Sequence, residues 1–170
     1  MAYFKLVVNI NDDESFKRIV NKPARGIGDT SVSALTAAAS NQKISLFKAA
    51  YGENLENFGL KPPAIKKIRD FCDMIGKLCL RSNNEDAYDV AAAAAMESGL
   101  LMFYKSDTSI EGQSRTANVE ELLNSVKIYI EEKQNEYMEE LQAEGLVNDG
   151  SEVVATDLPI VTLGDYLENV

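Results

Sequence analysis

The chain has 170 residues, 45% of them hydrophobic and 26% charged, a composition typical of a globular domain with one core. It contains no histidine, which excludes histidine-based acid–base catalysis and catalytic triads. No apolar run reaches the roughly 18 residues that a membrane span needs, and the first residues lack the pattern of a signal peptide. We therefore expect a cytoplasmic protein that does not enter a membrane.

The net charge of −10 is unevenly distributed along the chain. Residues 1–82 hold 13 basic and 8 acidic residues, whereas residues 83–170 hold 4 and 19. The first half is thus basic and the second half is strongly acidic. This asymmetry indicates a two-faced molecule with one end suited to nucleic acid.

The chain opens with an apolar-rich segment, residues 2–8, that has no N-cap before it and resembles the end of a longer helix. Asn11 or Asp12 can cap the next helix, because short polar side chains accept hydrogen bonds from the first exposed N–H groups. Pro23 ends that helix, since a proline biases the residue before it away from helical conformation.

Asp29 is expected to cap a third helix over about residues 30–40. Ser45 is expected to cap a short helix that reaches residue 51, and a loop with two glycines follows over residues 52–61.

Pro62 and Pro63 suit the first turn of a long helix that continues to about Arg81 with a clean apolar stripe. Cys72 and Cys79 lie on that helix, two turns apart. Their Cα atoms are then separated by roughly 10 Å, too far for a disulfide, so we interpret both as small core residues.

The acidic half predicts further helices and no strand. We expect a helix over residues 85–104 that breaks near Ser98-Gly99, a polar loop over 106–114, a long helix over 116–144, a linker over 148–158 and a last helix from about residue 162. The fold class is therefore all-α, a compact multi-helix domain spanning residues 1–170.

Two glycines near the start of the chain predict a hairpin that binds phosphate. Gly26 and Gly28 allow positive φ and close approach of another molecule, while Ile27 can fill the core and pin the turn. The N–H groups at the following helix start, the Thr30 hydroxyl and the Arg25 guanidinium can all bind a phosphate without reading a base. A tight turn with no ligand is an equally good explanation of the pattern.

A second glycine turn precedes the long basic helix. Gly59 is followed by Lys61, and then by Lys66 and Lys67 in the first two helical turns. Phosphate contact by these three lysines is one interpretation, and a solvated helix face is the other.

The acidic residues of the longest predicted helix do not converge on one point. We interpret them as a solvated face or a partner surface, and not as a metal site or a catalytic carboxylate pair. They are Glu131, Glu132, Glu136, Glu139, Glu140 and Glu144.

Several stretches resemble the UvrD/PcrA/Rep group of DNA helicases, in which a string ending N-x-P-x-R-G-I-G-D-x-T opens the 2B subdomain. The matching stretches are Ala2-Tyr3-Phe4-Lys5-Leu6-Val7-Val8-Asn9, Asn11-Asp12-Asp13-Glu14-Ser15-Phe16, Arg18-Ile19-Val20-Asn21-Lys22-Pro23-Ala24-Arg25-Gly26-Ile27-Gly28-Asp29-Thr30, Asn118-Val119-Glu120-Glu121-Leu122 and Leu163-Gly164-Asp165-Tyr166-Leu167. The match is specific in the first third of the chain and loose over residues 31–113.

The resemblance implies an all-helical insertion in the second motor domain of an ATP-dependent 3′-to-5′ helicase. Such an insertion contacts duplex DNA near a single-strand/double-strand junction through helix-hairpin-helix-like turns, and its partners are that DNA and the motor domains of its own chain. ATP and Mg would belong to the motor. This chain has no G-x-x-x-x-G-K-[ST] loop, so we expect no bound cofactor and no enzymatic activity of its own.

The resemblance also carries over site residues one by one. Arg25, Gly26, Ile27, Gly28 and Thr30 match the duplex-contacting turn. The second turn at Lys61 departs from the family, which has Gly-Arg where this chain has Pro62-Pro63. Two alternatives stay open, a free-standing helix-hairpin-helix protein and a helical protein-interaction module that uses the acidic long helix.

Overall fold

The computed structural model describes residues 1–145 and 158–170, and over these residues it consists of helices joined by turns and loops. The expected linker at 148–158 lies outside the described residues, except for Leu158. The helices are α1 (Ala2–Val8), α2 (Asp13–Ile19), α3 (Asp29–Gln42), α4 (Leu46–Ala49), the 3₁₀ turn η1 (Leu55–Phe58), α5 (Pro62–Ser82), α6 (Ala87–Glu97), α7 (Leu100–Ser106), α8 (Ile110–Ala143) and α9 (Leu163–Glu168). The predicted all-α class is confirmed for the described residues.

Side-chain caps fix where several helices begin. The Asp12 carboxylate accepts from the N–H of Ser15 at 3.0 Å, and the Ser45 hydroxyl accepts from the N–H of Lys48 at 3.3 Å. Both caps were predicted and both are confirmed. At α9, Thr162 and Asp165 form a reciprocal capping box, which satisfies two backbone donors at once.

Two predicted helix starts were wrong. The cap of α3 is Gly28, so the helix begins at Asp29 itself and Asp29 is not the cap. The long helix α8 begins at Ile110 and not near residue 116, because Ser109 caps it by accepting the N–H of Gly112. Within the predicted loop over residues 52–61, η1 forms one short turn.

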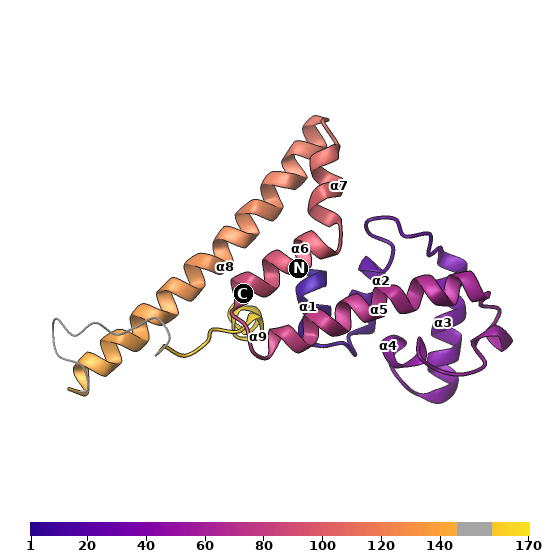
Figure 1. Ribbon diagram of the computed structural model, residues 1–170, viewed down its shortest axis with the longest axis horizontal. Coiled ribbons are helices and arrows are strands. Elements are labelled where there is room, and N and C mark those ends of the chain that lie inside the picture. The colour runs from indigo at the N-terminus through magenta and orange to yellow at the C-terminus, as the bar shows by residue number, and fades with distance from the viewer. Residues whose placement is uncertain (146–157) are drawn as a thin grey trace.

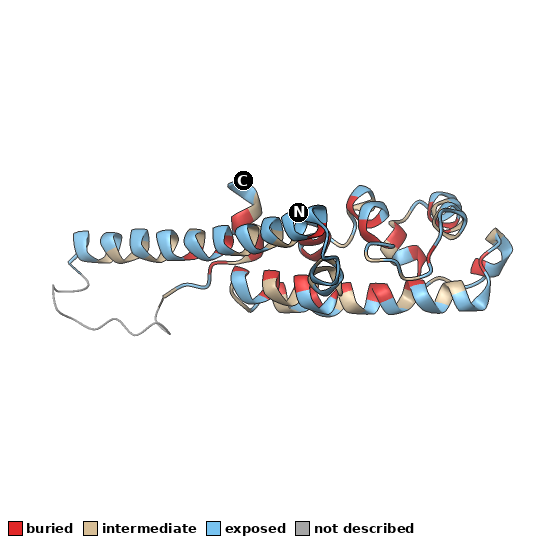
Figure 2. Ribbon diagram, turned by 90° about the horizontal axis from the view of Figure 1, so that it is seen from above, coloured by how far each residue is buried: buried red, intermediate tan, exposed pale blue. Residues whose placement is uncertain are grey.

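Helix α5 is the central helix of the basic half, and Figure 1 shows α1 beside its C-terminal half and α3 and α4 around its N-terminal end. The predicted apolar stripe is confirmed, and the red residues along one side of α5 in Figure 2 belong to it. Its fully or nearly buried members are Ile68, Phe71, Cys72, Ile75 and Leu78.

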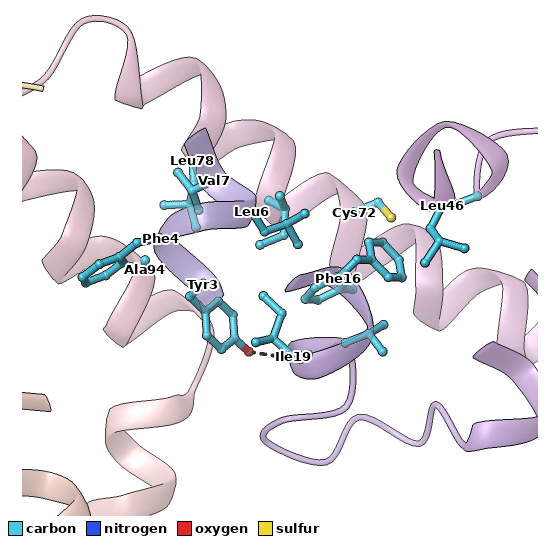
Figure 3. Packing of buried hydrophobic residues seen from close by; sticks show 14 of the residues in the cluster. Tyr3, Phe4, Leu6, Val7, Phe16, Ile19, Leu46, Cys72, Leu78 and Ala94 are labelled. Atoms are coloured by element: carbon cyan, nitrogen blue, oxygen red, sulfur yellow. Dashed lines mark hydrogen bonds between the residues drawn. The ribbon is translucent and has the colours of Figure 1, made fainter. Parts of the chain in front are cut away.

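One hydrophobic core joins the helices of both halves. Figure 3 shows Leu6 and Val7 of α1 and Phe16 of α2 pointing towards the side chains of α5. The Phe16 and Phe71 rings meet edge to face, with their centroids 5.4 Å apart. Cys72 and Cys79 are free thiols, as predicted, and burial raises the pKa of Cys72 to about 12.

The acidic half is more open. Helix α8 pairs with α6 and α7 and then extends past the rest of the molecule, with its C-terminal end far from α3 (Figure 1). Over its whole length it buries Gly112, Val126 and Ile130, and most of it is exposed in Figure 2. None of the helices in the described part of the chain combines the length and the apolar character that a membrane crossing requires.

Candidate nucleic-acid interface

The turn between α2 and α3 is organised by one amide side chain. The Asn21 side-chain oxygen accepts from the backbone N–H of Arg25 at 2.7 Å and from that of Ile27 at 3.2 Å. Asparagine is suited to this role because its short amide replaces a backbone partner in a turn. Gly26 has φ +73°, the left-handed region that favours glycine, and Ile27 is 1% exposed in the core. The predicted burial of Ile27 is confirmed.

The start of α3 presents backbone donors to solvent. Gly28 is extended, with φ −82° and ψ 172°, and its carbonyl accepts the N–H of Val32 at 3.1 Å. Within residues 1–145 and 158–170, no side chain caps this helix. Gly28, Asp29 and Thr30 are exposed residues, and they lie at the start of a 14-residue helix. Unpaired N–H groups and the helix dipole together favour an anion at this position.

Asp29 takes a different place from the one predicted for it. As the first helical residue it lies in the turn where a negative charge is favourable to the helix, but its carboxylate makes no capping hydrogen bond.

Gly28 has an ordinary negative φ, so its lack of a side chain matters for close approach and not for backbone conformation. A Cβ built at Gly28 meets nothing within 4 Å.

Lys67 of α5 lies beside this turn. A Cβ built at Gly26 would lie 2.8 Å from the Lys67 Nζ, so the ammonium group packs against the open face of the glycine. Lys67 is exposed, and among the described residues it has no ion-pair partner. The fold thus brings a residue of the second predicted turn next to the first one, which sequence spacing alone did not indicate.

The second turn offers fewer donors. Gly59 has φ +94°, and Lys61 is the N-cap of α5. Pro62 and Pro63 occupy the first two helical positions and have no N–H. Among the first helical residues, only Ala64 is left to supply a backbone donor, because the next N–H already bonds to the carbonyl of Lys61.

Lys66 is also engaged within the protein. Its Nζ lies 2.8 Å from the Asp70 carboxylate, and this hydrogen bond raises the pKa of Lys66. The adjoining groove, of about 630 Å³, contains carboxylates as well as cations, which makes it a poor phosphate site. Its charged lining residues are Glu53, Glu56, Lys66, Arg69 and Asp70. Phosphate contact by Lys61 and Lys66 stays a prediction.

Arg25 is turned inward. Its two terminal guanidinium nitrogens donate to carbonyl oxygens at the end of α2, to the Tyr3 hydroxyl and to the Ser98 carbonyl. A phosphate contact by Arg25 stays a prediction, and making it would mean giving up some of these bonds. The contributions of Asn21, Tyr3 and Ser98 were not predicted from the sequence, although an asparagine next to a glycine turn is a usable signal.

The described residues offer little for chemistry beyond binding. Within them, no group of three or more histidine, cysteine, aspartate or glutamate side chains is placed to hold a metal ion. The Cys72 thiol is buried and its raised pKa keeps it protonated, so it is not an activated nucleophile. The basic end can donate hydrogen bonds to an anion and attract it by positive charge.

Over the residues that the structure describes, the fold and this end of the molecule define an all-helical domain with an exposed helix start that no side chain caps, close to a lysine that has no ion-pair partner. Comparison with known proteins gives the family: the profile of the UvrD-like helicase C-terminal domain matches residues 1–163. The chain belongs to this family.

Individual relatives agree with the profile. DNA helicase II of Escherichia coli K12 is 28% identical over 143 residues, and that of Haemophilus influenzae is 30% identical over 143 residues, each match covering 84% of this chain. The ATP-dependent DNA helicase PcrA of Staphylococcus epidermidis is 30% identical over 131 residues, 77% of this chain. The chain spans only about a fifth of the length of these relatives, 20%, 20% and 18% respectively.

Proposed function

We propose that this chain is the accessory 2B subdomain of an ATP-dependent 3′-to-5′ DNA helicase and that it binds the backbone of duplex DNA. The observation that carries the proposal is the α3 start, where exposed and uncapped N–H groups lie beside Gly26 and the Lys67 ammonium. These groups recognise phosphate and not bases, so binding is independent of sequence.

In this proposal five of the predicted site residues have a defined part. Gly28 and Thr30 supply backbone donors, with the Thr30 hydroxyl as a further donor. Gly26 allows the turn and the approach of Lys67, and Ile27 anchors the turn in the core. The hairpin acts as a helix-hairpin-helix-like clamp on one phosphate.

We further propose that residues 1–170 form one helical domain inserted in a helicase motor. A single hydrophobic cluster that joins α1, α5, α6 and α9 supports one domain. Helices α1 and α9 pack together, and the N and C labels lie close together in Figure 1, which suits an element that leaves and re-enters another domain at one place. ATP and Mg would then be used by the motor, and this chain would bind neither.

A duplex titration tests the proposal. Fluorescence anisotropy of the 170-residue chain with two unrelated labelled duplexes should give similar affinities, in the range of about 10⁻⁴ to 10⁻⁶ M for non-specific binding and stronger at low salt. The pure chain should not turn over ATP. A sequence-selective complex, no binding at low salt, or DNA-stimulated ATP hydrolysis would each contradict the proposal.

A second candidate function is protein interaction through α8. The observation that favours it is that no described residue of α8 after Ile130 is buried, while the exposed surface is rich in glutamate. One cation there, Lys133, is paired with Glu136 at 2.7 Å. Binding of a basic protein that is unaffected by duplex DNA and lost on reversing Glu139 and Glu140 to lysine would support this function.

A further inference from the structure

Arg25 is the most heavily bonded side chain near the α2–α3 turn. Its two terminal nitrogens donate to five oxygens, namely the carbonyls of Ile19 (2.9 Å), Val20 (3.2 Å), Lys22 (3.2 Å) and Ser98 (2.9 Å) and the hydroxyl of Tyr3 (2.6 Å). The carbonyls of Ile19, Val20 and Lys22 lie at or just after the C-terminal end of α2, where helix carbonyls lack partners within the helix. The guanidinium thus closes the end of α2 and fixes the path of the chain into the turn.

The same guanidinium lies over aromatic rings. Its carbon is 5.0 Å from the centroid of Phe71 and 5.9 Å from that of Tyr3. Phe71 is on α5, four residues after Lys67, and residues four apart share one face of a helix. Arg25 therefore connects the turn that contains Gly26 to the helix face that carries the Lys67 ammonium.

Tyr3 and Ser98 extend this connection to other helices. The Tyr3 hydroxyl accepts from Arg25 and donates to backbone carbonyls of Ile19 and Lys22; the bond to Ile19 is drawn in Figure 3. Burial raises the pKa of Tyr3, so the hydroxyl keeps its proton for these bonds. Ser98 lies between α6 and α7, so its carbonyl ties the turn to the junction of the acidic half.

We propose that Arg25 is a positioning residue. It holds the backbone N–H groups of α3 and the Lys67 ammonium where one phosphate can contact both, and it does not touch the DNA itself. This inference rests on the proposed function, because the register matters only if the turn binds phosphate. The planar guanidinium suits the task, since its fork satisfies several oxygens at fixed angles while its face packs on a ring. Lysine has the charge but neither the fork nor the flat face.

The positioning role and a direct phosphate contact predict different variant behaviour. If Arg25 binds phosphate, Arg25→Lys keeps most of the affinity, and Arg25→Ala lowers the slope of log affinity against log salt by about one. If Arg25 positions the turn, Arg25→Lys weakens duplex binding almost as much as Arg25→Ala does, and neither substitution changes that slope. Tyr3→Phe removes one acceptor of the fork at a residue on α1, so it affects duplex binding only under the positioning role.

The experiment is an anisotropy titration of the 170-residue chain and its variants with a labelled duplex at several salt concentrations. It is run at a low temperature at which circular dichroism shows each variant folded. We expect Arg25→Lys and Arg25→Ala to bind at least about fivefold more weakly at unchanged slope and Tyr3→Phe about twofold more weakly, whereas Lys67→Ala lowers the slope by about one. Arg25→Lys or Tyr3→Phe binding like the parent chain would overturn the positioning role.

A measurement without DNA separates the two proposals. In ¹H–¹⁵N spectra of the free chain, Arg25→Lys should shift the amide signals of Gly26 and of residues 28–31, with a control variant, Lys127→Gln on α8, leaving them in place. If the parent chain does not bind duplex, the proposed function fails, and the positioning of the turn is then judged from these signals alone. Unchanged amide signals in Arg25→Lys would overturn it whatever the binding result.

Discussion

The two glycine turns of the basic half have nearly the same sequence signature but differ in the backbone N–H donors of the helix that follows. Each has a glycine with positive φ, Gly26 or Gly59, a helix start and nearby lysines. At α3 the first residues are exposed and no described side chain caps their N–H groups, whereas at α5 two prolines remove the first two such groups. The difference teaches that a glycine with positive φ does not by itself make an anion site, because the supply of N–H donors at the helix start differs between the two turns.

The strongest test of this comparison uses two neighbouring lysines of α5. Lys67→Glu should weaken duplex binding about tenfold or more, because it replaces the ammonium group beside Gly26 with a carboxylate that repels phosphate. Lys66→Glu makes the same change in net charge one residue away, at a lysine that is already paired with Asp70. It should lower duplex affinity by about threefold or less. Equal losses in an anisotropy titration would mean that net charge, and not the turn, governs binding.

A substitution at the helix cap acts on stability and binding in opposite directions. In Gly28→Asn, the new amide oxygen can accept a backbone N–H of α3, which stabilises the helix by a few tenths of a kcal/mol and occupies a donor that phosphate would use. We expect a melting temperature equal to or above that of the parent chain and duplex binding about three- to fivefold weaker.

The matched control for this cap is Gly59→Asn in the second turn. Asparagine tolerates the left-handed conformation that Gly59 adopts, and a Cβ there meets no atom within 4 Å. Its duplex affinity should stay within about twofold of the parent value. If this control weakens binding as much as Gly28→Asn does, the two turns are equivalent and the comparison fails.

Removing the cap lysine of the second turn should have a smaller effect. Lys61→Ala leaves α5 with the same prolines at its start, and we expect a change in duplex affinity below about twofold with no change in salt dependence. The measurement is the slope of log affinity against log salt. A slope lowered by about one would show that Lys61 does contact a phosphate.

The smallest expected effect on binding comes from the cap of α2, which precedes the first turn. Asp12→Ala removes the acceptor for the N–H and hydroxyl of Ser15 and should lower the free energy of unfolding by roughly 1 to 2 kcal/mol at pH 7, with duplex binding nearly unchanged.

The acid dependence of this effect has a definite sign. The Ser15 hydrogen bonds hold the pKa of Asp12 below its usual value, so its contribution is present above the unfolded pKa and is lost as the pH falls through the lower, folded pKa. Thermal melts of parent and variant should therefore converge on acidification below about pH 4. A constant difference down to pH 2 would contradict this assignment.

Much of the helical layout was predictable because caps, prolines and apolar periodicity determine these helices locally, whatever their neighbours in space. Pro62 and the apolar stripe of α5 indicated that helix without any knowledge of its neighbours, and Asp12 and Ser45 indicated their own helix starts. The start of α8 was missed because polar residues and Gly112 suggested a loop. In the structure a Cβ at Gly112 would lie 2.3 Å from the Asp107 carbonyl oxygen, so this glycine allows a close approach inside a helix.

The candidate site was predictable only in part. Rules of helix capping rank aspartate well as an N-cap, yet Gly28 takes that position because Asn21 and Ile27 set where the turn ends. The contact of Lys67 with Gly26 depends on how α5 packs across the core, and no local pattern encodes that packing. The inward bonding of Arg25 likewise depends on Tyr3 and Ser98, which are distant in sequence.

The projection of α8 away from α3 has a consequence for how the molecule meets a polyanion. The glutamate-rich C-terminal half of α8 lies at one extreme of the molecule and the basic turns near the other (Figure 1), so the separated charges give the protein a dipole moment along its length. The field of a polyanion exerts a torque on this dipole and turns α8 outward before contact. For the duplex binding proposed above, collisions are then pre-oriented with the basic end leading, and low ionic strength strengthens this orientation even though the chain as a whole is acidic.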